Sequence, residues 1–275
     1  MLALLSRSDS SQNVRRTATF FVVFATVLIS PGCEPSGQRG GAGPGHRQQK
    51  LGLTPKQEYD LGGKAYRQVL DKARQKDELL SADSRETRLV QRVGERIVKA
   101  VEIEPLQREI HLNLKGYRFD WQFNVLRSRQ VNAFCLPGGR VVVYTGLLRI
   151  VANDDQLATV LSHEIAHALA HHANERITTE ESGHVNWLFR QAYDRQQESE
   201  ADHIGLFLMT FAGYDPDEAL DFWQHMERLS QGGHLPEILS DHPSDQRRIQ
   251  QLRMWIPQAK AAKLAFDHHR IAPSR

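Results

Sequence analysis

The amino-acid sequence predicts an α+β domain that is mostly helical and carries a small antiparallel sheet. Apolar residues recur at helical spacing in the early and late parts of the chain, whereas in the middle they alternate with polar residues. This order of helices, then strands, then helices points to the α+β class. The 275 residues are 40% apolar and 25% charged, which is typical of a globular protein with one sizeable core.

The charge distribution argues against a nucleic-acid partner. The chain has 35 Lys and Arg against 33 Asp and Glu, for a formal net charge of +2. Both signs are mixed along the whole length, unlike the concentrated basic face of a nucleic-acid-binding protein. We therefore expect protein or peptide partners and no nucleic acid.

Residues 1–33 resemble an export signal. Two arginines precede an apolar run at 18–29, which is shorter than a membrane span and suits the core of a signal peptide. Gly32 then precedes Cys33, as at a bacterial lipoprotein processing site, where the cysteine would receive lipid. Ser30 and Pro31 depart from the residues usual there, so a plain signal peptide or an uncleaved membrane anchor is the alternative.

The rest of the chain divides into a tether and one domain. Residues 34–50 are rich in Gly, Pro and Gln and predict a flexible tether, and residues 51–275 form the folded domain. Glu34 follows Cys33, and by analogy with lipoprotein sorting this indicates the periplasmic side of a bacterial outer membrane. Lipid on Cys33 would leave Cys135 alone in an apolar strand, where a cysteine usually acts as a small hydrophobic residue.

Capping residues and apolar spacing mark the helices. Thr54-Pro55 predicts a helix start, and residues 84–101 form a second helix with one apolar face. After the strands, a helix runs from Asn153 to about Asn174, and another runs from about 184 to Ala212 and ends at Gly213. A third begins at the capping box that lies at 215–218.

Three apolar segments predict the sheet. Residues 117–125 alternate between apolar and polar side chains, which is typical of a strand with one buried face. Two further apolar runs lie at 131–136 and 141–144, and Pro137-Gly138-Gly139 between them predicts a turn.

The segment 163–167 reads HEIAH and predicts a zinc site. His163 and His167 are four residues apart, so on a helix they share a face and can reach one Zn²⁺ at about 2.1 Å. Glu164 lies about 100° round the helix, from where it can act as the general base toward an attacking water. Apolar neighbours make this helix partly buried, where unpaired polar groups would be costly.

A third metal ligand has to come from elsewhere in the chain. His171 lies about 12 Å along the axis from His163, too far to share the ion, so we expect His171 and His172 near the helix C-terminus, where the dipole favours them. Glu198 and Asp202 are four apart and share a face, which suits a ligand and a partner that fixes a ligand histidine. Glu200 is expected to point away from the metal. Taken alone, these carboxylates would instead indicate a solvated acidic face.

These motifs together resemble peptidase family M48, in particular its small periplasmic and mitochondrial-type members. The resemblance extends over residues 51–255 and rests on HEIAH at 163–167, ESEAD at 198–202, and three further segments at 132–139, 144–148 and 242–249. It implies a membrane-associated enzyme with one zinc ion per chain, held by His163, His167 and Glu198, and many members act in protein quality control. The helices that span the membrane several times in some branches are absent, as is an appended helical repeat.

Under this resemblance Asn132, Ala133 and Phe134 would bind substrate. A peptidase must hold its substrate extended, and pairing it with the edge of a sheet does so with little sequence selectivity. The alternative is a core hairpin that has no free edge.

We expect a zinc endopeptidase that cleaves unfolded or misassembled proteins of the bacterial envelope, tethered to the membrane by lipid. The alternative is a chaperone-like envelope assembly factor with a latent or mainly structural zinc site. His242, in a His-Pro turn, bears on this choice. It would act as a fourth ligand that keeps the site shut, as an oxyanion donor, or merely as a turn residue.

Overall fold

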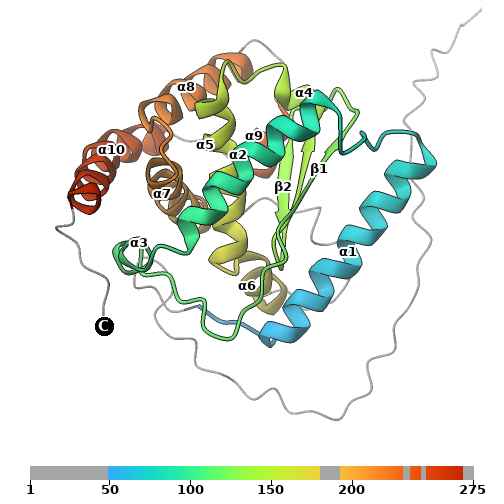
Figure 1. Cartoon of the computed structure of the whole chain (residues 1–275), viewed down its shortest axis with the longest axis horizontal. Coiled ribbons are helices and arrows are strands. Elements are labelled where there is room, and N and C mark those ends of the chain that lie inside the picture. The colour runs from blue at the N-terminus through green and yellow to red at the C-terminus, as the bar shows by residue number, and fades with distance from the viewer. Residues whose placement is uncertain (1–48, 180–192, 232–235, 243–245, 269–275) are drawn as a thin grey trace, which may run out of the picture. The chain divides into compact units, whose positions relative to one another are not determined.

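A computed structural model describes residues 49–179, 193–231, 236–242 and 246–268 (Figure 1). All of them belong to one compact unit of the chain. The predicted export signal with Cys33, and nearly all of the predicted tether, lie outside these residues. The described part is mostly helical with one small sheet, which confirms the α+β class, and it contains no helix long and apolar enough to cross a membrane.

The secondary structure follows the capping and periodicity signals closely. Thr54 caps the first helix, Ser84 the second and Asn153 the fifth, each by accepting a backbone N–H two or three residues further on. The elements are α1 (Pro55–Gln75), α2 (Arg85–Val101), α3 (Glu104–Glu109), β1 (Gln122–Leu126), β2 (Ala133–Leu136), β3 (Arg140–Tyr144), α4 (Thr145–Leu148), α5 (Asp154–Leu169), α6 (His172–Thr179), α7 (Arg195–Phe211), α8 (Asp217–Gln231), α9 (Glu237–Asp241) and α10 (Gln246–Asp267).

The sheet is mixed, so the expectation of an antiparallel sheet was wrong for one of its strands. Its order is β1-β3-β2, with β2 antiparallel and β1 parallel to the central β3. Gly138 and Gly139 have positive φ and make the predicted tight turn between β2 and β3. β1 starts only at Gln122, because the backbone N–H groups of Asp120 and Gln122 bond to the carbonyls of this turn.

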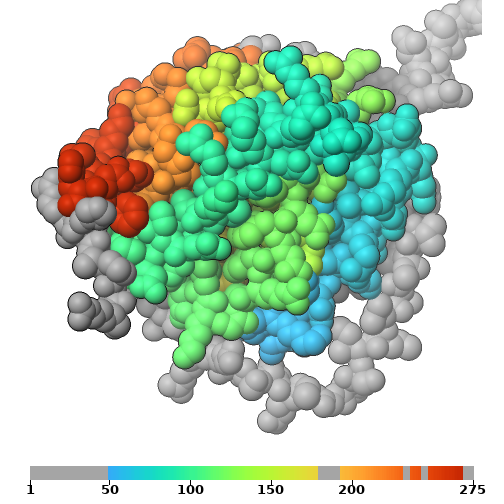
Figure 2. Space-filling view, in the orientation of Figure 1, coloured from blue at the N-terminus to red at the C-terminus, as the bar shows by residue number. Residues whose placement is uncertain are grey.

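Helices cover both faces of the sheet. On one face α2 and α5 enclose Val141 and Val143, and on the other face α1 covers Val142. All three valines are fully buried. Figure 1 shows the strands between α1 and the pair α2 and α5, and the space-filling view shows α2 across the front of the molecule (Figure 2). The sheet therefore has no exposed face, and its strand β2 lies at an edge.

Two helix boundaries differ from the predicted ones. The helix predicted to reach Asn174 ends at Leu169, because His171 adopts a left-handed conformation with φ of 57° and starts a new direction for α6. The helix predicted from residue 184 begins at Arg195, where Asp194 and Gln197 form a capping box. Residues 180–192 are not described. The predicted end of α7 at Gly213 is confirmed.

Close packing of α7 on α5 sets the position of the predicted site. Gly205 of α7 faces the backbone of α5, where an added Cβ would lie 3.0 Å from both the nitrogen of His163 and the carbonyl carbon of Ser162. No other residue permits so close an approach. It places one face of α7, with Glu198 and Asp202, directly against the HEIAH segment.

We predict that Gly205→Ala weakens both folding and metal binding, because α7 must move outward to clear the α5 backbone. Overpacking of this kind costs about 1–3 kcal/mol of unfolding free energy. Urea unfolding and a zinc titration measure the two effects. The matched control is Gly63→Ala in α1, whose new methyl would meet only the side-chain ends of Arg140 and Arg67. It should be neutral or stabilising by up to about 1 kcal/mol, and equal behaviour of the two variants would contradict the prediction.

Candidate metal centre and active site

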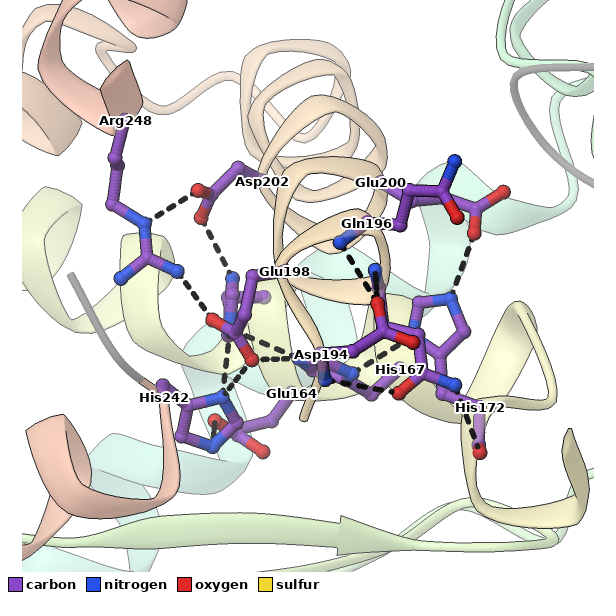
Figure 3. A network of polar contacts seen from close by, with 12 residues as sticks. Glu164, His167, His172, Asp194, Gln196, Glu198, Glu200, Asp202, His242 and Arg248 are labelled. Atoms are coloured by element: carbon purple, nitrogen blue, oxygen red, sulfur yellow. Dashed lines mark hydrogen bonds and ion pairs between the residues drawn. The ribbon is translucent and has the colours of Figure 1, made fainter. Parts of the chain in front are cut away.

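Four buried side chains converge between α5, α7 and α9. They are His163, His167, Glu198 and His242, and one potential ligand atom from each lies within 4.8 Å of all the others. The two α5 histidines project from adjacent turns, with their Nε2 atoms 3.0 Å apart. Figure 3 shows Glu198 of α7 reaching His167, while His242 enters from the end of α9.

The spacing of these atoms fits a single tetrahedral ion. Atoms bound at about 2.1 Å to one tetrahedral ion lie about 3.4 Å from each other. His163 Nε2 lies 3.5 Å from Glu198 Oε2 and 3.1 Å from His242 Nδ1, and His167 Nε2 lies 3.4 Å from Glu198 Oε1. Three imidazoles and one carboxylate form a donor set typical of zinc. The residues present therefore could hold a zinc ion.

A second layer of side chains fixes the carboxylates. Asp202 lies one turn beyond Glu198, and its Oδ1 is 2.9 Å from His163 Nδ1, the contact expected of a residue that orients this histidine. Arg248 of α10 donates to Asp202 Oδ2 at 2.5 Å and also to Glu198, and its guanidinium lies 4.0 Å from the Trp223 ring centroid. Arg248 lies in one of the segments that resemble the family, but the sequence alone did not predict its role.

Burial and charge set the protonation of this cluster. Burial opposes ionisation of Glu198, yet its pKa lies well below the ordinary value because His242, His163 and His167 surround it. Burial holds the pKa of His167 well below its usual range. For His163, burial lowers the pKa, but the bonds to Asp202 and Glu198 outweigh it and raise the pKa to about 10. An ionised Glu198 and a neutral His167 are the forms in which these side chains bind metal.

Glu164 lines a cavity beside the cluster and shares this lining with His242. The cavity has a volume of about 310 Å³, and Asn132, Ala133 and Phe134 line it together with Glu164. Burial raises the pKa of the Glu164 carboxyl above its ordinary value, as is typical of a catalytic base. The structure thus brings the predicted base and the three predicted substrate residues of the edge strand to one cavity.

His242 closes the metal cluster and also reaches the predicted base. Its Nδ1 lies 2.9 Å from Glu198 Oε1, and its Nε2 lies 3.2 Å from Glu164 Oε1. Hydrogen bonds to the chain just before β2 hold the helix α9 that carries it. Ile238 donates to the Val131 carbonyl at 3.0 Å, and Asn132 donates to Asp241 at 2.8 Å.

Two contacts of His167 were not predicted. The ring of Tyr193 stacks on the imidazole with a centroid distance of 3.7 Å, and burial raises the pKa of Tyr193 to about 12. His167 Nδ1 lies 2.8 Å from His172 Nδ1, and His172 in turn bonds to Glu200. His171 and His172 do follow the C-terminus of α5 as expected, but His171 turns away and pairs with Glu58. Glu200 points away from the cluster as expected, although not into solvent.

Comparison with known proteins gives the family. The model of peptidase family M48 matches residues 84–185 and 180–256. The chain is 36% identical over 165 residues to the mitochondrial metalloendopeptidase OMA1 of Saccharomyces cerevisiae, which covers 50% of this chain and 48% of the yeast protein. It is 34% identical over 175 residues to the human protein of that name, covering 52% of this chain and 33% of the relative. The beta-barrel assembly-enhancing protease of Escherichia coli is 26% identical over 164 residues, covering 48% and 34%.

The chain therefore spans about half or less of the length of these curated relatives. The family model, in contrast, covers well over half of the chain and includes α2, the sheet, α5, α7 and the first half of α10. All the side chains that form the candidate metal cluster lie within the matched residues. On this evidence, the chain belongs to peptidase family M48.

Proposed function

We propose that this protein is a zinc-dependent endopeptidase, with His163, His167 and Glu198 as ligands and Glu164 as the general base. The observation that carries the proposal is that a buried glutamate of raised pKa lines one cavity together with His242, which belongs to the four-residue ligand cluster. A bound zinc ion would supply Lewis acidity, polarising the scissile carbonyl and lowering the pKa of water. Glu164 would accept the proton of the attacking water and pass it to the leaving amine.

The cavity also supports an extended polypeptide as substrate. β2 pairs with β3 along one edge, and within the described residues no strand pairs with its other edge. Asn132, Ala133 and Phe134 line the cavity at the start of β2, so a substrate strand added there would lie beside Glu164. Recognition through backbone hydrogen bonds depends little on the substrate's side chains, which suits unfolded or misassembled envelope proteins as substrates. The name of the Escherichia coli relative, a beta-barrel assembly-enhancing protease, agrees with this substrate class.

Glu164→Gln should abolish cleavage of unfolded casein while zinc binding remains, because the amide cannot accept a proton but leaves the ligands in place. Loss of a general base costs about 10²–10⁴-fold in rate. His163→Ala should instead lose most of the zinc. Peptidase assays together with zinc content by atomic absorption distinguish the two variants. If the wild type does not cleave casein, the comparison with and without Glu164→Gln is made in the His242→Ala background. Cleavage that proceeds at an unchanged rate after Glu164→Gln would reject the assignment of the base.

We further propose that His242 holds the enzyme latent. Its Nδ1 is as close to the other ligand atoms as they are to each other, so it would complete a closed set of four protein ligands. A closed set leaves no position for a water molecule, which also favours the second candidate function, an assembly factor whose zinc site is mainly structural. An enzyme of this kind would need α9 to move before it could cleave.

His242→Ala separates these functions. Peptidase activity should rise if His242 is a lock, because the fourth position is then open to water, and should fall by about 10²–10³ if it is an oxyanion donor. The control is His225→Ala, a partly exposed histidine of α8 outside the cavity lining. Casein cleavage measured at full zinc occupancy gives the answer. Unchanged activity would leave His242 as a turn residue, and a site inactive in every variant would favour the assembly factor.

We also propose that the mature protein is anchored by lipid on Cys33 and faces the periplasm from a bacterial outer membrane. The sequence before Cys33 supports this proposal, which lies outside the described residues. Mass spectrometry of the N-terminal peptide from the membrane fraction should show a diacylglyceryl-modified cysteine. The matched change is Cys33→Ser, which should release the protein from membranes. A mature protein that starts at any other residue would rule out the anchor.

A further inference from the structure

A buried network of hydrogen-bonded side chains extends from the metal cluster on the side opposite Asp202. It runs from His167 to His172, with 2.8 Å between their Nδ1 atoms, and from His172 Nε2 to Glu200 Oε2 at 2.9 Å (Figure 3). The two histidines are fully buried and Glu200 is nearly so, with 9% of its surface exposed. Buried polar groups require hydrogen-bond partners, and these two contacts supply such partners to all three side chains.

We propose that His172 and Glu200 are positioning residues for His167, acting as a relay that fixes its tautomer and ring orientation. With a metal ion bound at His167 Nε2, the positions of the ring protons follow from the geometry. His167 Nε2 faces the other ligand atoms, so it must offer its lone pair there and carry the ring proton on Nδ1. His172 Nδ1 then accepts this proton's hydrogen bond. The remaining proton of His172 sits on Nε2, where the Glu200 carboxylate accepts it.

The backbone between the two histidines is shaped for this contact. In a continuous helix, His172 would lie about 140° round the axis from His167, five residues earlier, and could not reach its ring. The left-handed residue His171, with φ of 57°, ends α5 and redirects the chain. Its own imidazole is held by Glu58 at 2.9 Å and stacks on Tyr117 with centroids 3.6 Å apart. The break that the sequence did not predict is what returns His172 to the metal ligand.

The two α5 ligands are thus oriented in different ways. His163 meets the carboxylate of Asp202 directly, whereas a second imidazole separates His167 from the carboxylate of Glu200. Outer partners of a metal-binding histidine typically contribute about 10–100-fold to metal affinity or activity. This inference rests on the proposed metal function, because a relay that orients a ligand has meaning only if the cluster binds zinc.

The test is a set of zinc affinities, measured by competition with a chromophoric chelator on the full chain. His172→Ala should weaken zinc binding about 10–100-fold. His172→Asn should recover most of that loss, since its Oδ1 can take the place of Nδ1 as the acceptor. Glu200→Gln should weaken binding in the wild-type background but not in the His172→Ala background, because Glu200 acts only through His172.

The matched control is Glu218→Gln, which alters a carboxylate that bonds to Gln156 at the start of α5 and does not contact a ligand or the relay. Its zinc affinity should be that of the wild type. Visible spectra of the cobalt-substituted proteins provide a second measure, because His172→Ala should shift the d–d bands and Glu218→Gln should not. If His172→Ala does not fold, the zinc affinities of His172→Asn and Glu200→Gln test the relay instead.

Wild-type affinity in both Glu200→Gln and His172→Ala would overturn the relay, and so would a Glu200→Gln loss that persists in the His172→Ala background. A wild-type chain that binds no zinc would overturn the proposed metal function and the relay with it. A wild-type chain that binds zinc, with variants that all bind equally well, would overturn the relay alone.

Discussion

The structure of the candidate metal site depends on the ion pairs and hydrogen bonds that two carboxylates make in the protein interior. Glu198 and Asp202 are both buried on α7 against α5, and an unpaired buried charge would cost several kcal/mol, on the order of 3–5. Arg248 bridges them from α10, and the histidines at 163, 167 and 242 supply the other partners. Removing Arg248 would take away a cation that both carboxylates share. The C-terminal helix is therefore part of the site, although it supplies no metal ligand.

This constraint links stability to metal binding. Three imidazoles and one carboxylate point their ligand atoms at a common centre, which is a favourable arrangement for a bound cation. Gly205 allows the helices to come close enough for this, and a larger residue there would separate Glu198 from the histidines. Zinc bound to the folded state alone would stabilise the protein by mass action, so the same contacts serve folding and the proposed chemistry.

The proposed latency and the proposed substrate site share residues. Asn132 lines the cavity and also donates to Asp241 of α9, while Val131 exchanges hydrogen bonds with α9 through its N–H and C=O groups. These contacts hold His242 over the cluster. A polypeptide that paired with the start of β2 would meet α9 there, so opening of the metal position and entry of substrate involve the same hydrogen bonds.

Local features of the site were predictable from the sequence, whereas contacts between distant segments were not. Helical periodicity places His163 and His167 on one helix face, and Glu198 and Asp202 on another. The dipeptide Gly138-Gly139 predicts the turn between β2 and β3. The parallel pairing of β1 depends on hydrogen bonds between segments that no periodicity reveals. Arg248, Tyr193 and the pair of His172 with Glu200 are brought to the cluster only by the packing of α10, α7 and α6. Arg248 and Glu200 fall within the motifs of the resemblance, and His172 lies beside the HEIAH motif, but the break at His171 concealed the role of His172.

The central claim is that His163, His167 and Glu198 hold one zinc ion at the meeting point of α5 and α7. Anomalous X-ray diffraction from crystals of the zinc-loaded protein, collected on both sides of the zinc absorption edge, tests it most directly. The account predicts a single strong peak about 2.0–2.2 Å from His163 Nε2, His167 Nε2 and a Glu198 oxygen. A folded protein with no zinc at this position, or with zinc held by other side chains, would contradict it.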